Sequence, residues 1–228
     1  MPPTTRRLAP RTQLADDVAG YVRDLIVSGQ VRAGEFLRLE SLAEQLGTSV
    51  TPVREALVSL RGEGFVVLQP RRGFVVAPFT KQDILDLYQV QAYLAGELAA
   101  RACAHLSQED RDRLHAVQRE LAASHARQDA SAVERLNHDF HRTINLAASA
   151  PKLTQFLVTA TRYSPQLFFA QIAGWAQASS DDHEAILAAL DQTDADRARD
   201  AMVSHVTKAG ALLAEHLESQ GVWAQEES

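Results

Sequence analysis

The sequence predicts a mainly α protein of two domains: an N-terminal winged helix-turn-helix, with three helices plus a β-hairpin wing, followed by an all-α helical bundle of six or seven helices. Three observations predict this fold. Apolar residues recur at helical spacing early in the chain and give way to two short β-prone runs around residue 70. Alanine-rich helical stretches with hardly a strand signal fill the chain after residue 79. The balance of charge changes sign at the same place.

The composition is that of an ordinary globular protein. With 228 residues, 46% hydrophobic and 23% charged, the chain is long enough for one large or two small domains. Its single cysteine, Cys103, excludes an internal disulfide framework and any cysteine-built metal site. No apolar run approaches the roughly 18 residues of a membrane span, and the N-terminus lacks the apolar core of a signal peptide. We therefore expect a cytoplasmic protein with no membrane partner.

Charge separates the two predicted domains, which we place at 10–78 and 79–222. The net charge of the chain is −6. Residues 1–78 carry 10 Lys and Arg against 8 Asp and Glu, a balance of +2, whereas residues 79–228 carry 13 against 21, a balance of −8. A small basic excess beside an acidic body is compatible with nucleic-acid contact confined to the first domain.

The first domain begins with two predicted helices. In the stretch TQLADDVAGYVRDLIVSGQ, apolar residues lie at helical spacing and stop at a Ser-Gly pair, which predicts the first helix. A glycine-punctuated loop follows. In the stretch ESLAEQLG, Ser41 and Glu44 form a capping-box pair and Gly47 provides the stop, which predicts a helix of about two turns.

A third helix is predicted to follow Thr51, whose side chain would accept free backbone N–H groups, with Pro52 at the first helical position. At about 100° per residue, apolar side chains gather on one face and arginines on the other. The apolar face holds Val53, Leu57 and Leu60, and the opposite face holds Thr51, Arg54, Val58 and Arg61. The run FVVLQPRRGFVV then predicts a hairpin with Arg71, Arg72 and Gly73 at its tip.

This layout suits DNA recognition. The major groove admits one helix, whose first turn reaches base edges. Arg54 is placed to bond guanine or phosphate, and Arg61 lies about 10 Å further along the same face, where it can contact the backbone. Arg71 and Arg72 would reach the adjacent groove or its phosphates. The alternative is that these arginines form a solvated face of a small protein-interaction domain.

The second domain has the pattern of a helical bundle. A Ser or Thr followed three residues later by an acid recurs five times, as expected for helix starts. These pairs are Thr80/Asp83, Ser107/Asp110, Ser131/Glu134, Ser179/Asp182 and Thr193/Asp196. Segments at Pro151 and Pro165 add further helices. Core packing is the favoured interpretation of the aromatic residues Phe168, Phe169 and Trp175.

Four residues of this domain match the composition of a metal site with nitrogen and oxygen ligands. Asn137 and His141 lie four residues apart on a predicted helix, His183 opens the next-to-last helix, and His205 lies within the last. Spacing alone does not show that they converge. A hydrolytic zinc enzyme and a module that senses the metal itself are the alternatives. An enzyme of this kind also needs a general base, and we interpret the neighbouring acids as solvated or helix-start groups instead. These acids are Asp139, Asp181, Asp182 and Glu184.

The N-terminal motif resembles that of a known family. The stretch LAEQLGTSVTPVREALVSLRGEGFVVLQPRRGFVV is similar to the GntR family pattern L-A-x-x-L-G-V-S-R-T-P-V-R-E-A-L, followed by L-x-x-E-G and a wing containing R-G. The resemblance covers residues 12–77 and implies binding to double-stranded operator DNA. The residues that it implies as DNA contacts are Ser49, Thr51, Arg54, Arg72 and Gly73. Val50 stands where the family usually has an arginine, which puts the usual operator sequence in doubt.

The rest of the chain, residues 80–222, is similar to the FCD domain, the all-α effector domain of the FadR-like subgroup of that family. The resemblance implies a divalent metal ion, zinc or nickel, at the floor of a pocket for a small-molecule effector. The ligands that it implies are Asn137, His141, His183 and His205. Asparagine in the place of a frequent aspartate removes a negative charge, which predicts weaker metal binding.

Three positions depart from the usual pattern of that domain. Gln91 and Ala95 replace an arginine and a glutamate, and Ala150 replaces an asparagine. In relatives such groups help to hold carboxylate effectors, so a carboxylate is only one candidate here and a more apolar pocket is expected. Candidate residues of this effector pocket are Gln91, Arg162 and Tyr163.

Together these features predict a ligand-responsive transcription regulator. An effector that binds one dimer geometry better than another would change DNA affinity by its differential binding free energy. A homodimer is expected because a single recognition helix reads few bases, and two-fold symmetry doubles the contact with a palindromic operator.

Overall fold

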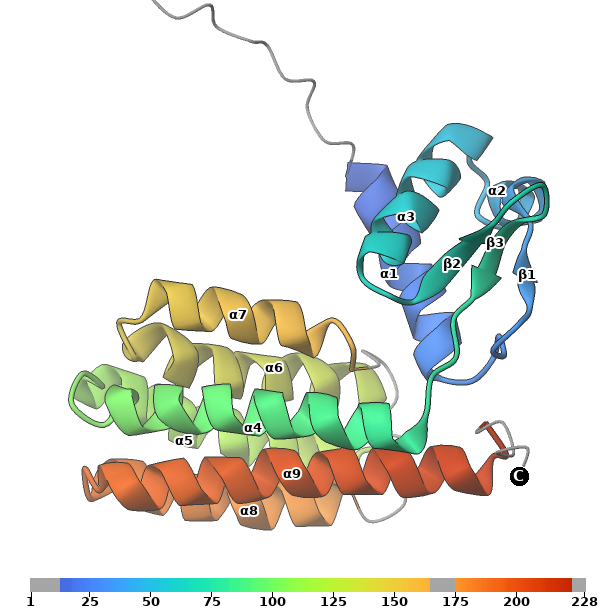
Figure 1. Cartoon of the computed structure of the whole chain (residues 1–228). Coiled ribbons are helices and arrows are strands. Elements are labelled where there is room, and N and C mark those ends of the chain that lie inside the picture. The colour runs from blue at the N-terminus through green and yellow to red at the C-terminus, as the bar shows by residue number, and fades with distance from the viewer. Residues whose placement is uncertain (1–12, 165–174, 223–228) are drawn as a thin grey trace, which may run out of the picture. The chain divides into compact units, whose positions relative to one another are not determined.

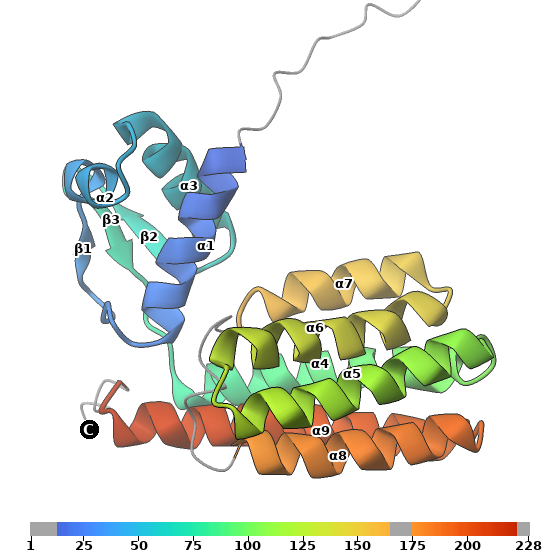
Figure 2. The same ribbon diagram turned by 180° about the vertical axis from the view of Figure 1, so that it is seen from behind.

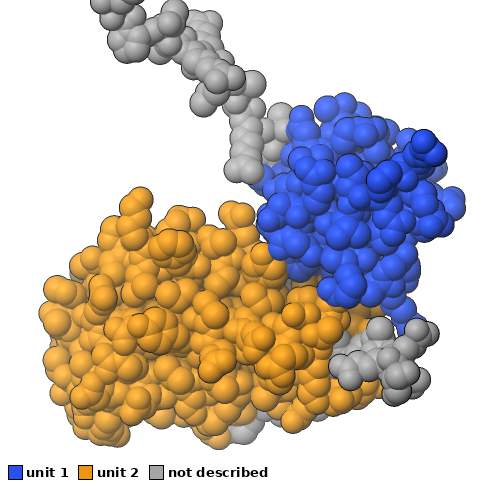
Figure 3. Space-filling model, in the orientation of Figure 1, with its two compact units in different colours: residues 1–26, 30–78 blue, residues 27–29, 79–228 orange. Residues whose placement is uncertain are grey.

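The computed structural model describes residues 13–164 and 175–222, and the chain forms two compact units (Figures 1 and 3). Unit 1 contains residues 1–26 and 30–78, and unit 2 contains residues 27–29 and 79–228. The sequence predictions for residues 10–12, Pro165, Phe168 and Phe169 lie outside the described residues. Among the described residues, no helix combines the length and the apolar composition that crossing a membrane requires.

The described residues of unit 1 form three helices and a small antiparallel sheet. Its elements are α1 (Gln13–Val27), β1 (Phe36–Leu37), α2 (Leu39–Gln45), α3 (Val50–Gly62), β2 (Val66–Gln69) and β3 (Gly73–Val76). The strand order is β1-β3-β2. The β2–β3 hairpin is the predicted wing, and Gln69 lies opposite Gly73 at its tip. Strand β1 falls in the predicted loop; with only two residues it has no periodicity of its own, and pairing with β3 defines it.

The core of unit 1 lies beneath the predicted apolar face of α3. Val53, Leu57 and Leu60 are fully buried, whereas Arg54 and Arg61 on the opposite side are exposed, as predicted. An ion pair between Arg23 of α1 and a glutamate just after α3 ties the two helices together at 2.8 Å. This helix therefore presents its arginine face to solvent because its other face is fixed in the core.

Two predicted helix starts in unit 1 are wrong by one or more residues. Helix α2 begins at Leu39, so Ser41 lies inside it and forms no cap. Helix α3 begins at Val50 with Ser49 as its extended N-cap residue, and Thr51 lies in the first turn. Pro52 is tolerated there because the first backbone N–H groups of a helix have no intrahelical acceptor. Gly47 follows α2 with φ of 62°, which confirms the predicted stop.

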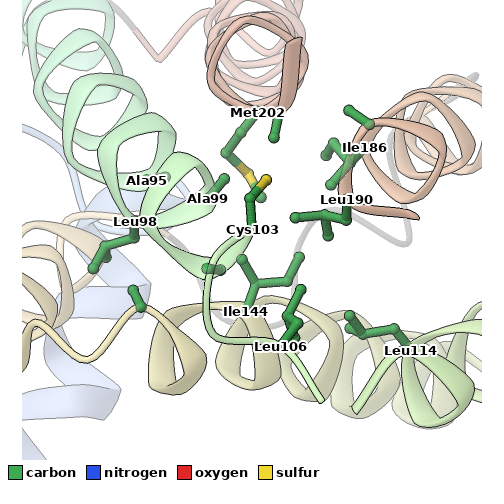
Figure 4. Packing of buried hydrophobic residues seen from close by; sticks show 14 of the residues in the cluster. Ala95, Leu98, Ala99, Cys103, Leu106, Leu114, Ile144, Ile186, Leu190 and Met202 are labelled. Atoms are coloured by element: carbon green, nitrogen blue, oxygen red, sulfur yellow. The ribbon is translucent and has the colours of Figure 1, made fainter. Parts of the chain in front are cut away.

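Unit 2 is a helical bundle, with six helices in the described residues (Figures 1 and 2). They are α4 (Lys81–Ala102), α5 (Gln108–Ala126), α6 (Ala130–Ala147), α7 (Pro151–Thr161), α8 (Trp175–Asp191) and α9 (Ala195–Ser219). Alanine and branched aliphatic side chains from several helices fill its core, with Cys103 and Met202 among them (Figure 4). Helices α4 and α9 approach closely because each has a glycine that faces the other helix, Gly96 on α4 and Gly210 on α9. A Cβ at Gly210 would lie 2.5 Å from Tyr88.

The predicted starts of the unit 2 helices are partly right. Thr80 with Asp83 and Ser107 with Asp110 form complete capping boxes, as predicted. Pro151 occupies the first turn of α7. The other three predicted caps are wrong: Asp129 caps α6 in place of Ser131, Asp194 caps α9 in place of Thr193, and Ser179 lies inside α8. An aspartate side chain accepts the same backbone N–H bond as a serine or threonine, and the residue whose backbone is non-helical just before the first turn becomes the cap. Trp175 is buried, in keeping with core packing.

Candidate metal centre and nucleic-acid interface

Three histidines from three helices of unit 2 meet at one point. His141 comes from α6, His183 from α8 and His205 from α9, and one ring nitrogen of each lies within 4.8 Å of the others. His183 is fully buried and His205 is 5% exposed. The Nε2 atoms of His141 and His205 are 3.2 Å apart. His183 was expected at the start of its helix, but it lies in the middle of α8.

The orientation of His183 follows from its neighbour Gln118 on α5. The Gln118 amide nitrogen donates to the backbone carbonyl of Ser180, which can only accept. Its amide oxygen must then face His183 Nδ1 at 2.9 Å, so Nδ1 carries the proton. The lone pair of His183 consequently lies on Nε2, which is buried and has no hydrogen-bond partner in the described part of the chain. The Phe140 ring stacks on this imidazole with centroids 4.0 Å apart and fixes its plane.

His205 is oriented in the same way by a carboxylate. Its Nδ1 lies 3.5 Å from Asp182 Oδ2, while Lys208 donates to the other carboxylate oxygen at 2.6 Å. The hydrogen bond with His205 and the bond from Lys208 hold the pKa of Asp182 below its usual value. With Nδ1 turned toward Asp182, Nε2 of His205 faces His141. Such a carboxylate–histidine pair is a common support for a metal ligand.

The imidazoles of His141 and His183 are neutral at neutral pH. Burial lowers the pKa of His141 to about 3, with His205 and His138 adding to the effect. Burial also lowers the pKa of His183 well below its ordinary value, and the charges of His205 and His141 lower it further. Neutral rings keep a lone pair available, which is the state that a metal ion requires.

Asn137 is a further candidate donor on the helix that carries His141. It precedes His141 by one turn of α6, and its buried Oδ1 has no hydrogen-bond partner among the described residues. Buried polar atoms without partners are costly, and each calls for a ligand. The donor set of three imidazole nitrogens and one amide oxygen fits a divalent ion such as zinc or nickel.

The second candidate site is the exposed face of α3 with the wing. Thr51, Arg54 and Arg61 are exposed on α3, and Ser49 is exposed at its N-terminus. At the wing tip Arg71 has φ of 66° and Gly73 has φ of 98°, both left-handed conformations. The structure places Arg72 with its guanidinium 4.7 Å from the centre of the Phe36 ring. The predicted DNA-contacting residues therefore lie on α3, at its N-cap, or at the tip of the β2–β3 wing of unit 1.

Two family models match the chain. The model described as bacterial regulatory proteins, gntR family, matches residues 14–76, and the FCD domain model matches residues 86–208, which is more than half of the chain. The chain belongs to the GntR family. Its FCD domain contains the histidine cluster, and its GntR segment contains α3 and the wing, so both the predicted family and the predicted fold class are confirmed.

Individual GntR relatives agree with this assignment. An uncharacterized HTH-type transcriptional regulator of Mycobacterium tuberculosis is 28% identical over 154 residues, 68% of this chain and 62% of that protein, so the match spans less than two thirds of the relative. The Nta operon transcriptional regulator of Aminobacter aminovorans is 30% identical over 190 residues, 81% of this chain and 87% of its own. The solved structure of Escherichia coli McbR/YncC superposes with a TM-score of 0.70 at 23% identity, covering 90% of this chain and 99% of that one, which shows a shared fold.

The positions that depart from the FCD pattern have structural roles of their own. Gln91 is buried, and its amide donates to the Ala160 carbonyl at 3.1 Å, so it ties α4 to α7. Ala95 is part of the hydrophobic core, and Ala150 precedes α7 without a side-chain cap. The candidate pocket residues that follow the last turn of α7 are Arg162, which is exposed, and Tyr163, which is partly buried.

Sequence reasoning missed the residues that orient the histidines. Gln118 and Asp182 lie on α5 and α8, and neither matches a ligand pattern by itself. Ser179 was assigned to a helix start, yet its buried hydroxyl lies one turn before His183 without a partner among the described residues. Gln118 lies four residues after Leu114 and three before Leu121, both buried, so its place on the apolar face of α5 is the signal that could have indicated it.

Proposed function

We propose that this GntR family chain is a DNA-binding transcription regulator whose operator binding is modulated by a small molecule bound at a divalent metal ion in unit 2. One observation carries the metal part of the proposal. One ring nitrogen of each of the three histidines lies within 4.8 Å of the others, and the buried His183 Nε2 and Asn137 Oδ1 have no hydrogen-bond partner in the described residues. The DNA part rests on the family and on the exposed α3 face.

In this proposal Asn137, His141, His183 and His205 hold the ion. A zinc or nickel ion held by these residues would supply a Lewis acid for an oxygen or nitrogen donor of the effector. Gln118 keeps the His183 lone pair on Nε2, and Asp182 does the same for His205. None of the four proposed ligands carries a negative charge, so an anionic donor on the effector is favoured by the charge of the ion.

The proposed DNA contacts follow the geometry of unit 1. The first turn of α3 offers unpaired backbone N–H groups and the Ser49 hydroxyl to a phosphate. Arg54 follows in the next part of the same face, where it can reach a base edge, and Arg61 can contact the backbone. Val50 in the first turn is apolar, so it contributes no charge to this face.

We include a homodimer in the proposal because unit 2 exposes apolar residues on two neighbouring helices. Val90 and Tyr93 lie on the outer side of α4, and Phe156 lies on α7; Tyr93 and Phe156 are each 67% exposed. The Gln91 amide bonded to the Ala160 carbonyl shows that α4 and α7 pack side by side (Figure 1). Exposed aromatic residues of this size mark interaction surfaces.

Charge favours a second copy of the chain as the occupant of this face. The first half of α4 exposes Asp83 and Asp86, whereas α7 carries Lys152 and no acid. A two-fold axis that places α4 of one copy near α7 of the other would bring opposite charges together around the apolar residues. The same axis would supply two recognition helices for a palindromic operator.

The metal prediction is tested on the purified chain and two variants. His183→Ala removes one buried ligand, and we expect metal content measured by mass spectrometry to fall severalfold below the wild-type value. His138→Ala is the matched control because His138 is an exposed histidine of the same α6 helix. Equal metal content in His183→Ala and wild type would refute the ligand assignment.

The response of DNA binding separates the alternatives. Wild-type protein is titrated with a duplex selected from a random library, with Zn²⁺ or Ni²⁺ added or chelated. If the metal ion alone changes DNA affinity, the chain senses the metal; if affinity changes only when small organic acids or other effectors are also present, the effector proposal holds. Ester or amide hydrolysis abolished by His183→Ala would favour the enzyme instead.

The dimer is tested by replacing one apolar residue with a charge. Tyr93→Glu should shift the mass measured by light scattering from dimer toward monomer, because two copies of the new charge would be buried at the interface. Val67→Glu is the control, since Val67 is an exposed valine of β2 in unit 1. A wild-type monomer, or a Tyr93→Glu protein with unchanged mass, would contradict the assignment of this face.

A further inference from the structure

The wing arginine Arg72 is already held in place before any DNA is present. Its guanidinium carbon lies 4.7 Å from the centroid of the Phe36 ring, within the range of a cation–π contact. The two residues come from different segments: Phe36 from β1 and Arg72 from the turn between β2 and β3. The contact therefore joins the wing tip to a strand on the other side of β3.

The short strand β1 explains why an aromatic ring is available there. Phe36 pairs with Val75 and Leu37 with Phe74, so the two residues of β1 point to opposite faces of the sheet. Leu37 is buried, whereas Phe36 is 40% exposed. A phenylalanine at a sheet edge that faces solvent gains little from core burial, so its contact with Arg72 is its main described interaction.

The backbone of the wing tip is also fixed. Arg71 and Gly73 both have positive φ, and the Arg72 N–H donates to the Gln69 carbonyl at 3.1 Å. The position of the Arg72 Cα is thus set by the turn, and the remaining freedom belongs to its long side chain. The cation–π contact with Phe36 restricts that freedom, which would otherwise be lost only on DNA binding.

We propose that Phe36 is a positioning residue that presents Arg72 to DNA phosphates or to minor-groove acceptors beside the α3 site. An arginine can stack and bind at once, because stacking uses the flat face of the guanidinium and its five N–H donors point outward in the plane. Phe36 itself touches no DNA in this arrangement. The inference rests on the proposed DNA-binding function of unit 1 and adds to it the residue that orders the wing.

The test uses fluorescence anisotropy with the full-length chain and a duplex selected from a random library by the wild type. Phe36→Leu keeps an apolar side chain but removes the aromatic face, and it should weaken DNA binding about two- to fivefold. Phe36→Tyr and Phe36→Trp keep the face and should bind within twofold of wild type. Thermal unfolding of each variant checks that unit 1 remains folded.

A double-mutant cycle separates positioning from a merely structural role. In an Arg72→Ala background, Phe36→Leu should have no further effect on affinity, because the group that it positions is gone. In an Arg71→Ala background the full effect should persist, since Arg71 is the adjacent wing arginine without the stacking contact. Equal effects of Phe36→Leu in both backgrounds would overturn the inference, as would failure of Phe36→Tyr to retain binding.

The outcomes also distinguish this inference from the proposed function. If wild-type protein binds no duplex at any salt concentration, the DNA-binding proposal itself fails. If wild type binds and Arg54→Ala weakens it, but Phe36→Leu binds like wild type, only the role of Phe36 is refuted. Both measurements use the same duplex and the same protein preparation.

Discussion

In the candidate metal centre, the ability of a histidine to bind a metal ion depends on which of its two ring nitrogens faces the cluster. Two of the three imidazoles present a chosen nitrogen to the cluster because the other nitrogen meets an acceptor, which is Gln118 for His183 and Asp182 for His205. The sequence could predict the residue types of the donors and, through the family resemblance, their positions. It could not predict Gln118, because that contact joins residues 65 positions apart and depends on how α5 packs against α8.

Gln118 should therefore matter for metal binding although it is no ligand. We expect Gln118→Leu to weaken Zn²⁺ binding about 10- to 100-fold, because the buried His183 Nδ1–H loses its acceptor and the ring loses its orientation. Competition with a chelating dye measures the affinity. Gln108→Leu is the control, since Gln108 is an exposed glutamine on the same α5 helix. Equal affinities for the two variants would exclude this supporting role.

Helix starts show what could and could not be predicted at the level of the element. The two capping boxes at Thr80 and Ser107 could be predicted, because the side-chain pattern there has one interpretation. The start of α6 could not, because Asp129 and Ser131 are both good caps by residue type. Only the backbone conformation, which packing determines, selects Asp129.

This choice predicts different stabilities for two neighbouring variants. Asp129→Ala should lower the free energy of unfolding by about 1 kcal/mol, because its side chain accepts the Ala132 N–H at 3.0 Å. Ser131→Ala, inside the first turn of α6 and exposed, should change it by less than about 0.5 kcal/mol. Urea unfolding followed by tryptophan fluorescence suits this test, since Trp175 is buried in unit 2. The reverse order of effects would support the cap that the sequence suggested.

The small sheet of unit 1 shows a second limit at this scale. The β2–β3 wing could be predicted from its β-prone runs and its turn, but β1 could not, since two residues cannot show alternation. Its position depends on pairing with β3, a long-range interaction. Phe36, the residue proposed to order the wing, belongs to β1. Its position could therefore not be predicted from sequence periodicity.

At the scale of the whole molecule, the chain has two compact units with opposite charge balance. Residues 1–78 carry a small positive excess and residues 79–228 a negative balance of −8. The sequence indicated a change of character near residue 79, but it gave no sign that Val27–Gly29, at the end of α1, belong to the second unit. The proposed metal ligands all lie in unit 2 and the proposed DNA contacts all lie in unit 1.

This separation predicts that metal binding stabilises one unit much more than the other. A ligand that binds only the folded state, at 100 times its dissociation constant, stabilises that state by about 2.7 kcal/mol, which slows globally exchanging amides about 100-fold. Hydrogen exchange of the full chain, followed by mass spectrometry with and without Zn²⁺, should show this slowing in peptides of α4, α6, α8 and α9. Peptides of α1 and α3 should exchange at unchanged rates, because their cores contain no proposed ligand.

The same experiment has an internal control and a clear contrary result. His183→Ala should abolish the effect of Zn²⁺ in unit 2, because the ion loses a buried ligand. His138→Ala, which alters only an exposed histidine of α6, should keep it. Equal slowing of amide exchange in both units would mean that the two units unfold together and that metal binding stabilises both. In that case metal binding and operator binding would be coupled without a change of dimer geometry, because stabilising unit 2 would by itself stabilise unit 1, which contains the proposed DNA contacts.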